Sequence, residues 1–298
     1  ESQTVLDTIN PSMPTNTGGW GLEVPDQYRA DFFIKELKAF EARGEWPNLI
    51  LICLPNDHTS GTSRDFPTPA AQVADNDLAF GRIVEAISHS KFWPETAIFA
   101  IEDDPQDGWD HVSGYRTTAY CISPYTKRGA VIGTQYNTTS LLRTIEQILG
   151  LPPMNQFDAS ATPMFDCFTN TPNFQPFTSV LNTIALDHLN PIPQAINDPI
   201  LRRDAVVSGK INFREVDTAP EDTLNRILCR AMKGPREPYP EWAVTAAAAA
   251  ADCPIRPSAR PGGRHCLHLF APHTPRFQRL TRLTFPPGSH HASRGPQR

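Results

Sequence analysis

An α/β fold is the class that this sequence predicts, and two observations lead to it. Residues 48–54 and 96–101 are apolar runs with the length of buried strands. Apolar residues at helical spacing lie before, between and after these runs, over 26–44, 75–91 and 140–149. Strands that alternate with helices predict a sheet with helices packed on its faces.

The first predicted helix follows an irregular lead-in, residues 1–25, which is rich in Thr, Asn, Pro and Gly. We expect Asp26 to cap this helix at its start and Gly44 to end it. The strand 48–54 comes next, and a polar loop rich in Thr, Ser, Gly and Pro follows it. This composition is typical of a loop that lines a site.

The alternation of helix and strand continues beyond this loop. The second helix is predicted over 75–91, with Asp75 or Asn76 as its cap. A third strand is expected at 117–122, and the helix over 140–149 comes after it. These elements place the α/β core within a single stretch of the chain.

Composition divides the chain into four parts, of which the lead-in is the first. The α/β core spans 26–165, because the alternating patterns occur there. A Pro- and Asn-rich segment, 166–244, has one helical stretch over 221–232, and we expect it to wrap over the sheet irregularly. An Ala run followed by Arg, Pro and His fills 245–298, which predicts a disordered tail.

The charge distribution argues against nucleic acid as a partner. The tail from Asp252 to Arg298 has eight Arg, no Lys and one acid, so it carries +7 and the remainder carries −12 of the net −5. An acidic body does not attract a polyanion. No apolar run reaches the ~18 residues of a membrane span, so no transmembrane segment is predicted. The six cysteines lack C-x-x-C spacing and therefore do not indicate a zinc ribbon.

Three consecutive acids, Glu102, Asp103 and Asp104, follow the strand 96–101 without a spacer, and His111 comes shortly after them. Carboxylates crowded at the end of a buried strand repel one another unless a cation or a proton offsets their charge. Carboxylates together with an imidazole suit a metal ion held by oxygen and nitrogen ligands. The alternative interpretation is a solvated turn with a structural histidine.

A second carboxylate and imidazole, Asp57 and His58, follow the strand 48–54. Sites in open α/β sheets gather at the carboxyl ends of strands, so we expect the two loops to converge on one centre. Taken alone, Asp57 and His58 are explained equally well as turn or cap residues. Motifs for a serine-hydrolase elbow, a nucleotide-binding loop or an H-E-x-x-H zinc site are absent from the sequence.

Polar residues near the acidic loop have supporting roles in this prediction. Asp110 or Glu102 is placed to orient His111 from outside the ligand shell of the metal. Arg116 is expected either to contact a substrate phosphate or to pair with one of the acids. The glycosylation sequon Asn137-Thr138-Thr139 precedes a helix, and we expect it to be the helix cap.

Four segments of the chain resemble segments of a known protein family. They are LPNDHTSGT, VADNDLAFGRIVEAISHSKFWPETAIFAIEDDPQDGWDHV, RTTAYCISPYTKRGAV and LLRTIEQILGLPPMNQFDASATPMF. They resemble the C-terminal half of bacterial phosphoesterases in the alkaline phosphatase superfamily, which are related to acid phosphatases and phospholipases C. The resemblance covers Trp20 to Val244 and is most specific between Pro55 and Phe165. It implies an alkaline phosphatase-like sheet with helices on both faces, incomplete at the N-terminus, and irregular C-terminal wrapping.

The resemblance also implies a metal-dependent phosphoric ester hydrolase with two divalent metal ions, which are zinc, manganese or iron, with calcium as a further candidate. The implied metal ligands are Asp57, His58, Asp103, Asp104 and His111. Tyr115 stands where many relatives have a histidine, so one polar or metal contact differs in this chain. The implied partner is a small phosphoester or a phospholipid headgroup, and the implied location is periplasmic or secreted.

The catalytic nucleophile is unassigned. In the family, the N-terminal half supplies a further acidic ligand and a Ser or Thr nucleophile, and no matching segment precedes Trp20. We therefore expect a fragment that lacks the nucleophile half of the site. The alternative, from another functional class, is a non-catalytic metal- or partner-binding remnant of such an enzyme.

Overall fold

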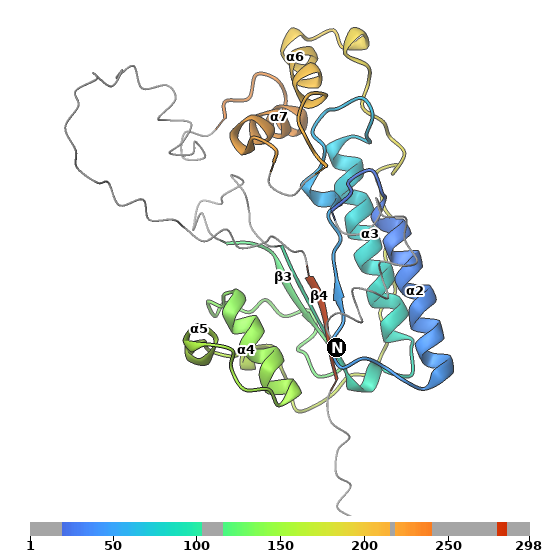
Figure 1. Ribbon diagram of the computed structural model, residues 1–298, viewed down its shortest axis with the longest axis vertical. Coiled ribbons are helices and arrows are strands. Elements are labelled where there is room, and N and C mark those ends of the chain that lie inside the picture. Colours follow the sequence, from blue (N-terminus) through green and yellow to red (C-terminus); the bar gives the residue numbers. More distant parts are fainter. Residues whose placement is uncertain (1–19, 103–115, 215–217, 240–278, 285–298) are drawn as a thin grey trace, which may run out of the picture.

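The computed structural model describes four stretches of the chain, which are 20–102, 116–214, 218–239 and the backbone of 279–284. It shows a mixed α/β fold, as predicted, with a four-stranded sheet between two groups of helices (Figure 1). Helices α2 (Asp26–Arg43) and α3 (Pro69–Ser88) lie on one side of the sheet. Helices α4 (Thr138–Leu149) and α5 (Gln156–Ser160) lie on the other side.

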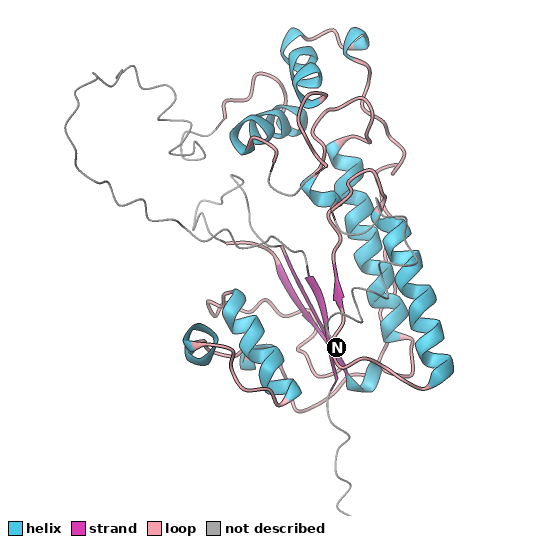
Figure 2. Cartoon of the chain, in the orientation of Figure 1, coloured by secondary structure: helices cyan, strands magenta, loops and turns pink. Residues whose placement is uncertain are grey.

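The sheet has the strand order β1-β4-β2-β3, and every neighbouring pair is antiparallel. Its strands are β1 (Leu51–Ile52), β2 (Thr96–Ile101), β3 (Ala119–Ile122) and β4 (Arg279–Thr284). Because β1 and β2 both pair antiparallel with β4, they run in the same direction (Figure 2). The segments that follow β1 and β2 therefore leave the sheet at the same edge.

Strand β1 is shorter than the strand predicted over 48–54, because only Leu51 and Ile52 pair with β4. Pro47 and Pro55 flank this stretch, and a proline has no N–H to extend a ladder. Strand β4 lies inside the segment assigned to the tail, and it gives backbone partners to the facing edges of β1 and β2. The rest of the segment 245–298 lies outside the described residues.

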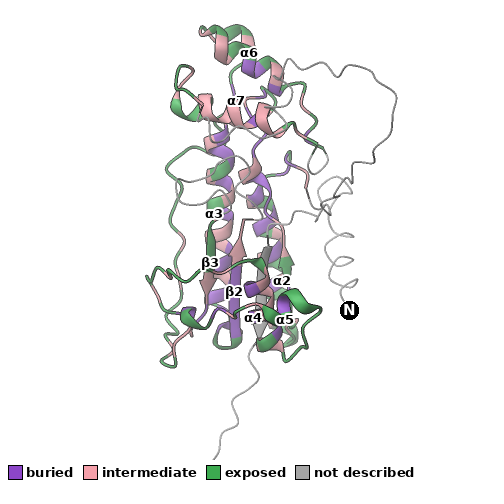
Figure 3. Ribbon diagram, turned by 90° about the vertical axis from the view of Figure 1, so that its left-hand side faces the viewer, coloured by how far each residue is buried: buried purple, intermediate pink, exposed green. Residues whose placement is uncertain are grey.

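Strand β2 is buried on both faces, and its alternating side chains contribute to two core clusters. Ile98 belongs to the cluster of α2 and α3, with Leu37 and Ile83. Phe99 belongs to the cluster on the opposite face, with Leu141 of α4. Figure 3 shows the buried strand β2 between the two helix layers. Full burial of side chains this large stabilises the fold by about 1.5–3 kcal/mol each.

Helix α2 ends as predicted at Gly44, and α4 ends after Leu149, the last residue of the predicted helix, at Gly150; the two glycines have φ angles of +75° and +69°. Glycine adopts this left-handed conformation without a steric penalty. Helix α4 begins at Thr138, two residues before the predicted helix, and the prediction that the sequon caps it is confirmed, since Asn137 accepts a hydrogen bond from the Ser140 N–H at 2.9 Å. The start of α2 differs, because Pro25 occupies the cap position and Asp26 is already helical.

Helix α3 begins six residues earlier than the predicted helix and ends at Ser88. Thr68 caps it by accepting a hydrogen bond from the Ala71 N–H at 3.3 Å, and Pro69 occupies the first turn. The prediction that Asp75 or Asn76 caps this helix is therefore wrong. Both residues lie inside α3, where the Asp75 side chain can reach the neighbouring helix.

Two helices lie in the segment after the core, α6 (Pro199–Ser208) and α7 (Glu221–Lys233). Helix α7 covers the stretch expected to be helical, whereas α6 was not predicted from the sequence. Asp198 caps α6 by accepting a hydrogen bond from the Ile200 N–H at 2.8 Å. Arg230 of α7 donates to Asp204 of α6 at 2.9 Å and joins the two helices. No helix in the described stretches has the length and apolar character needed to cross a membrane.

Candidate functional site

Asp57 and His58 lie in the loop that leaves the sheet after β1. They belong to a short 3₁₀ turn, η1 (Asn56–His58), and both are half-buried. Glu102 directly follows β2 and is half-buried as well. Because β1 and β2 end at the same edge of the sheet, both predicted loops begin at this edge.

Asn56 fixes the start of this loop, and it is buried although its neighbour Asp57 is not. Its side-chain Nδ2 donates to Oδ2 of Asp75 at 2.6 Å, and its backbone N–H donates to Oδ2 of Asp26 at 3.1 Å. Two helices, α2 and α3, therefore hold the residue before Asp57. Asn56 Oδ1 is buried and has no hydrogen-bond partner among the described residues, which leaves an unused acceptor beside Asp57.

Asp26 and Asp75 are two buried acids beneath the loop, and the side chains of both accept hydrogen bonds from Asn56. Oδ2 of Asp75 accepts from the backbone N–H of Asp26 at 2.6 Å, and Arg29 forms an ion pair with Asp26 at 3.0 Å. Asn76 donates to Asp26 at 3.0 Å. Burial raises the pKa of Asp26 to about 7, and the charge of Arg29 and the Asn56 N–H only partly oppose this effect.

Thr59, which follows His58, has an unusual backbone conformation, with φ 63° and ψ 161°. This region is populated almost only by glycine, and a β-branched residue there stores about 1–3 kcal/mol of strain. The conformation is held on both sides, since the Thr59 N–H donates to Asn56 O and the Ser60 N–H donates to Gln72 Oε1 at 2.8 Å. Strain of this kind clusters at functional sites.

The Pro- and Asn-rich segment, 166–244, covers the end of this loop that leads into α3 (Figure 1). The Thr62 N–H donates to Ser208 Oγ of α6 at 3.1 Å. Asn190 Nδ2 lies 2.9 Å from the carbonyl oxygen of Ser63 and 3.0 Å from that of Pro67. Gly61, at φ +59°, has no room for a side chain, because an added Cβ would lie 2.8 Å from Ser208 Oγ.

The His58 ring is oriented by two contacts. It meets the ring of Trp20 edge to face, with the centroids 4.5 Å apart. Its Nδ1 lies 3.1 Å from the carbonyl oxygen of Thr59, which can only accept, so Nδ1 carries the proton in this contact. Metal-binding histidines are typically fixed in this way through one ring nitrogen while the other nitrogen binds the metal. The geometry of His58 therefore fits the predicted ligand role.

Glu102 and Arg116 mark the two ends of the second loop. Glu102 Oε2 accepts a hydrogen bond from Thr117 Oγ1 at 3.0 Å, and the Glu102 N–H donates to the carbonyl oxygen of Thr118 at 3.2 Å. These bonds hold the two ends of the loop together beyond β2 and β3. Arg116 is exposed at the beginning of the returning strand segment.

The remaining predicted site residues, which are Asp103, Asp104, Asp110, His111 and Tyr115, lie outside the described residues. Within the stretches that the structure describes, no three His, Cys, Asp or Glu side chains form a group that could hold a metal ion. Of the predicted metal ligands, the described stretches contain the carboxylate of Asp57 and the imidazole of His58, and Glu102 is the described residue that is expected to orient a ligand. This mixture of oxygen and nitrogen donors fits zinc, manganese or iron.

The supporting roles of Asn56, Gln72 and Asp75 were not predicted from the sequence. The burial of Gln72 and Asp75 can be predicted when the helix is taken to begin at Pro69, with Thr68 as its cap. Gln72 and Asp75 then fall on the buried face of α3 together with Ala79. Polar side chains on an apolar face need partners, and here the partners are the loop residues Ser60 and Asn56.

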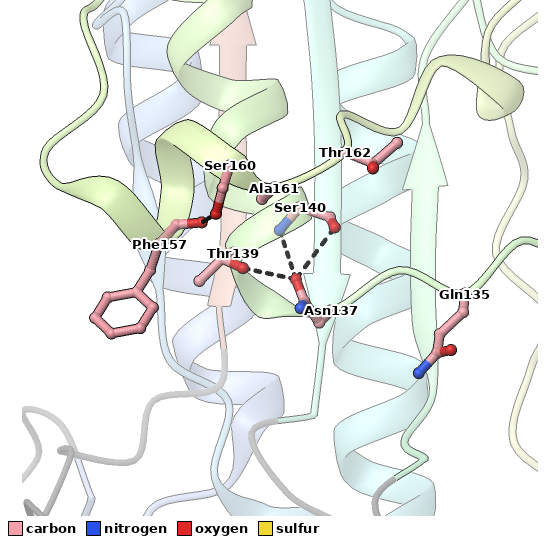
Figure 4. A pocket seen from close by; sticks show the side chains of 8 residues that line it. All are labelled: Gln135, Asn137, Thr139, Ser140, Phe157, Ser160, Ala161 and Thr162. Carbon is pink, nitrogen blue, oxygen red and sulfur yellow. Dashed lines mark hydrogen bonds between the residues drawn. The ribbon is translucent and has the colours of Figure 1, made fainter.

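A hollow of about 480 Å³ lies beside the start of α4 (Figure 4). No charged residue, histidine or cysteine lines it. Asn137, one of its lining residues, uses Oδ1 to accept hydrogen bonds from Thr139 Oγ1 and from Ser140, as the dashed lines show. The hollow therefore lacks the groups that acid, base or metal chemistry requires.

Comparison with known proteins gives one match, to a family model. No curated protein and no solved structure matches the chain. The family model of the Phosphoesterase family matches residues 25–152, from the start of α2 to just beyond α4. The match includes Asp57, His58 and the whole second loop. Over these residues the chain is similar to the Phosphoesterase family.

Proposed function

We propose that this chain is a metal-dependent phosphoric ester hydrolase whose site lies where β1 and β2 leave the sheet. The observation that carries the proposal is the common direction of these strands, which brings the Asp57-His58 loop and Glu102 to one edge. The family match over 25–152 supports the reaction class. The strained, buried support beneath Asp57 and His58 favours a site over an ordinary turn.

The proposed metal ligands are Asp57, His58, Asp103, Asp104 and His111. Two bound divalent ions would polarise the phosphoryl oxygens and stabilise the leaving oxygen. Hydrogen bonds between Asn56 and the acids of α2 and α3 keep the Asp57 backbone in place. Arg116 is proposed to bind the phosphate, with Glu102 and Asp110 orienting the ligands. The alkaline phosphatase-like architecture belongs to the same proposal.

The test combines metal content with hydrolysis on the same purified samples. Elemental mass spectrometry measures bound metal, and p-nitrophenyl phosphate and bis(p-nitrophenyl) phosphate report monoester and diester hydrolysis. The site variants are Asp57→Asn and the double variant Asp103→Ala/Asp104→Ala. The control is Asp65→Asn, an acid of the same loop whose side chain is 70% exposed.

We expect the wild type and the Asp65→Asn control to bind metal, and both site variants to lose it together with any ester hydrolysis that the wild type shows. Because no Ser or Thr nucleophile is assigned, hydrolysis by the wild type would mean that the chain contains a nucleophile besides the proposed metal ligands. Equal metal content in all four proteins would reject the ligand assignment. Metal that is lost in the site variants, without hydrolysis by the wild type, would reject the hydrolase and favour a non-catalytic metal-binding protein.

A further inference from the structure

Two thiols meet in the core on the α4 side of the sheet, away from the proposed site. Cys121 lies in β3, directly across from Phe99 of β2. Cys167 ends the short turn η3 (Phe165–Cys167) and is buried, at 7% exposure. Cys167 and Phe99 belong to the same core cluster, and Cys121 packs against it. Both thiols are free, and each shifts the pKa of the other, upward for Cys121 and downward for Cys167.

Backbone contacts fix the two segments that carry these cysteines. The Lys127 N–H donates to the carbonyl oxygen of Cys167 at 2.9 Å, and Thr126 forms an antiparallel bridge with Phe168. The Thr169 N–H donates to the carbonyl oxygen of Tyr125 at 2.8 Å. The segment after β3 therefore runs beside the segment around Cys167, and both segments are fixed against the core cluster that contains Cys167 and Phe99.

We propose that Cys121 and Cys167 form an intramolecular disulfide by exchange with a low-molecular-weight disulfide. The thiolate of one cysteine attacks a sulfur of the small disulfide, forms a mixed disulfide and releases one small thiolate. The second cysteine, as its thiolate, attacks the protein sulfur of the mixed disulfide and releases the other. Two protein thiols are oxidised, one small disulfide is reduced to two thiols, and the protein loses two hydrogen atoms.

The disulfide would enclose residues 122–166, which include α4 and α5. These helices cover one face of the sheet. A cross-link that closes a loop of this length restricts the unfolded chain and stabilises the folded one. The expected effect in a protein of this size is a rise in Tm of roughly 5–10 °C on oxidation.

The test compares the full chain equilibrated in oxidised glutathione and in excess reducing agent. Trypsin places Cys121 in peptide 117–127 and Cys167 in peptide 144–202, and neither peptide contains another cysteine. We expect mass spectrometry of the oxidised sample to show these two peptides linked, with the link absent after reduction. The Tm of the oxidised sample should exceed that of the reduced sample.

Variants separate this disulfide from other pairings of the six cysteines. Cys121→Ser and Cys167→Ala should lose both the linked peptide and the difference in Tm between oxidised and reduced samples. Because each variant is compared with itself, a loss of stability caused by the substitution cancels. Cys229→Ser, which changes a half-buried thiol of α7, should keep both. Absence of the linked peptide in the wild type, or an undiminished Tm difference in Cys121→Ser, would overturn the proposal.

Discussion

Thr59 has the only positive φ of any non-glycine residue among the described stretches, and it follows directly after His58. At most positions an alanine variant has a free energy of unfolding about 0.5–1 kcal/mol higher than that of the glycine variant. At Thr59 this order should be reversed, because alanine keeps the strain and glycine relieves it. We expect Thr59→Gly to be about 1–2 kcal/mol more stable than Thr59→Ala in urea unfolding.

Thr62 of the same loop serves as the matched control for Thr59, since its φ is not positive. Thr62→Ala and Thr62→Gly remove the same hydroxyl contact with Ser208. We expect the alanine variant to be the more stable of this pair. If alanine were also the more stable residue at Thr59, the backbone there would carry no strain.

Asp26 should make the stability of the protein depend on pH. Its folded pKa is raised from 3.8 to about 7, so its contribution to stability is full below pH 3.8 and is lost as the pH rises through about 7. Between pH 8 and pH 5, the wild type should gain about 2–3 kcal/mol in the free energy of unfolding relative to Asp26→Asn. Urea unfolding at unit steps of pH measures this difference.

An exposed acid gives the reference for this pH dependence. Asp65→Asn, whose side chain lies largely in solvent, should change the free energy of unfolding by less than about 0.5 kcal/mol at every pH. A difference between the wild type and Asp26→Asn that stays constant from pH 8 to pH 5 would mean that the Asp26 carboxyl is charged throughout, with Arg29 compensating its burial.

At the scale of elements, the loop after β1 and helix α6 touch at Gly61. Gly61→Ala must both accept a φ of +59° and displace Ser208, so it should cost about 2–4 kcal/mol. Gly129→Ala is the matched control, because Gly129 has a φ of +64° and no atom within 4 Å of the added Cβ. It should cost only about 1 kcal/mol. Equal losses in urea unfolding would show that α6 does not pack tightly on the loop.

The elements that the sequence predicts well are those with local signals. Gly44 and Gly150 end helices through their own conformation, and the apolar run of β2 needs no partner to be recognised. Asp75 is different, because an aspartate near a helix start resembles a cap. Its burial depends on Asp26 and Asn56, which are far from it in sequence.

For the whole molecule, the pattern of carboxylate and imidazole after two apolar runs locates the candidate site, and the direction of β1 and β2 brings both loops to one edge. The sequence does not predict that β4 lies between these strands, since pairing across more than 170 residues leaves no local pattern. The metal-ligand roles of Asp57, His58, Asp103, Asp104 and His111 stay predictions, and the last three of these residues lie outside the described stretches.

The contacts of Asn190 and Ser208 with the loop have a consequence for the order of events during synthesis. Asp57 and His58 leave the ribosome about 150 residues before Ser208 does. At about 5–20 residues per second, the loop waits roughly 10–30 s for the residues that hold its far end. Once α3 has been made, the nascent chain has the helices beside the loop but lacks the cover that fixes its shape, so the loop acquires its final form late in translation.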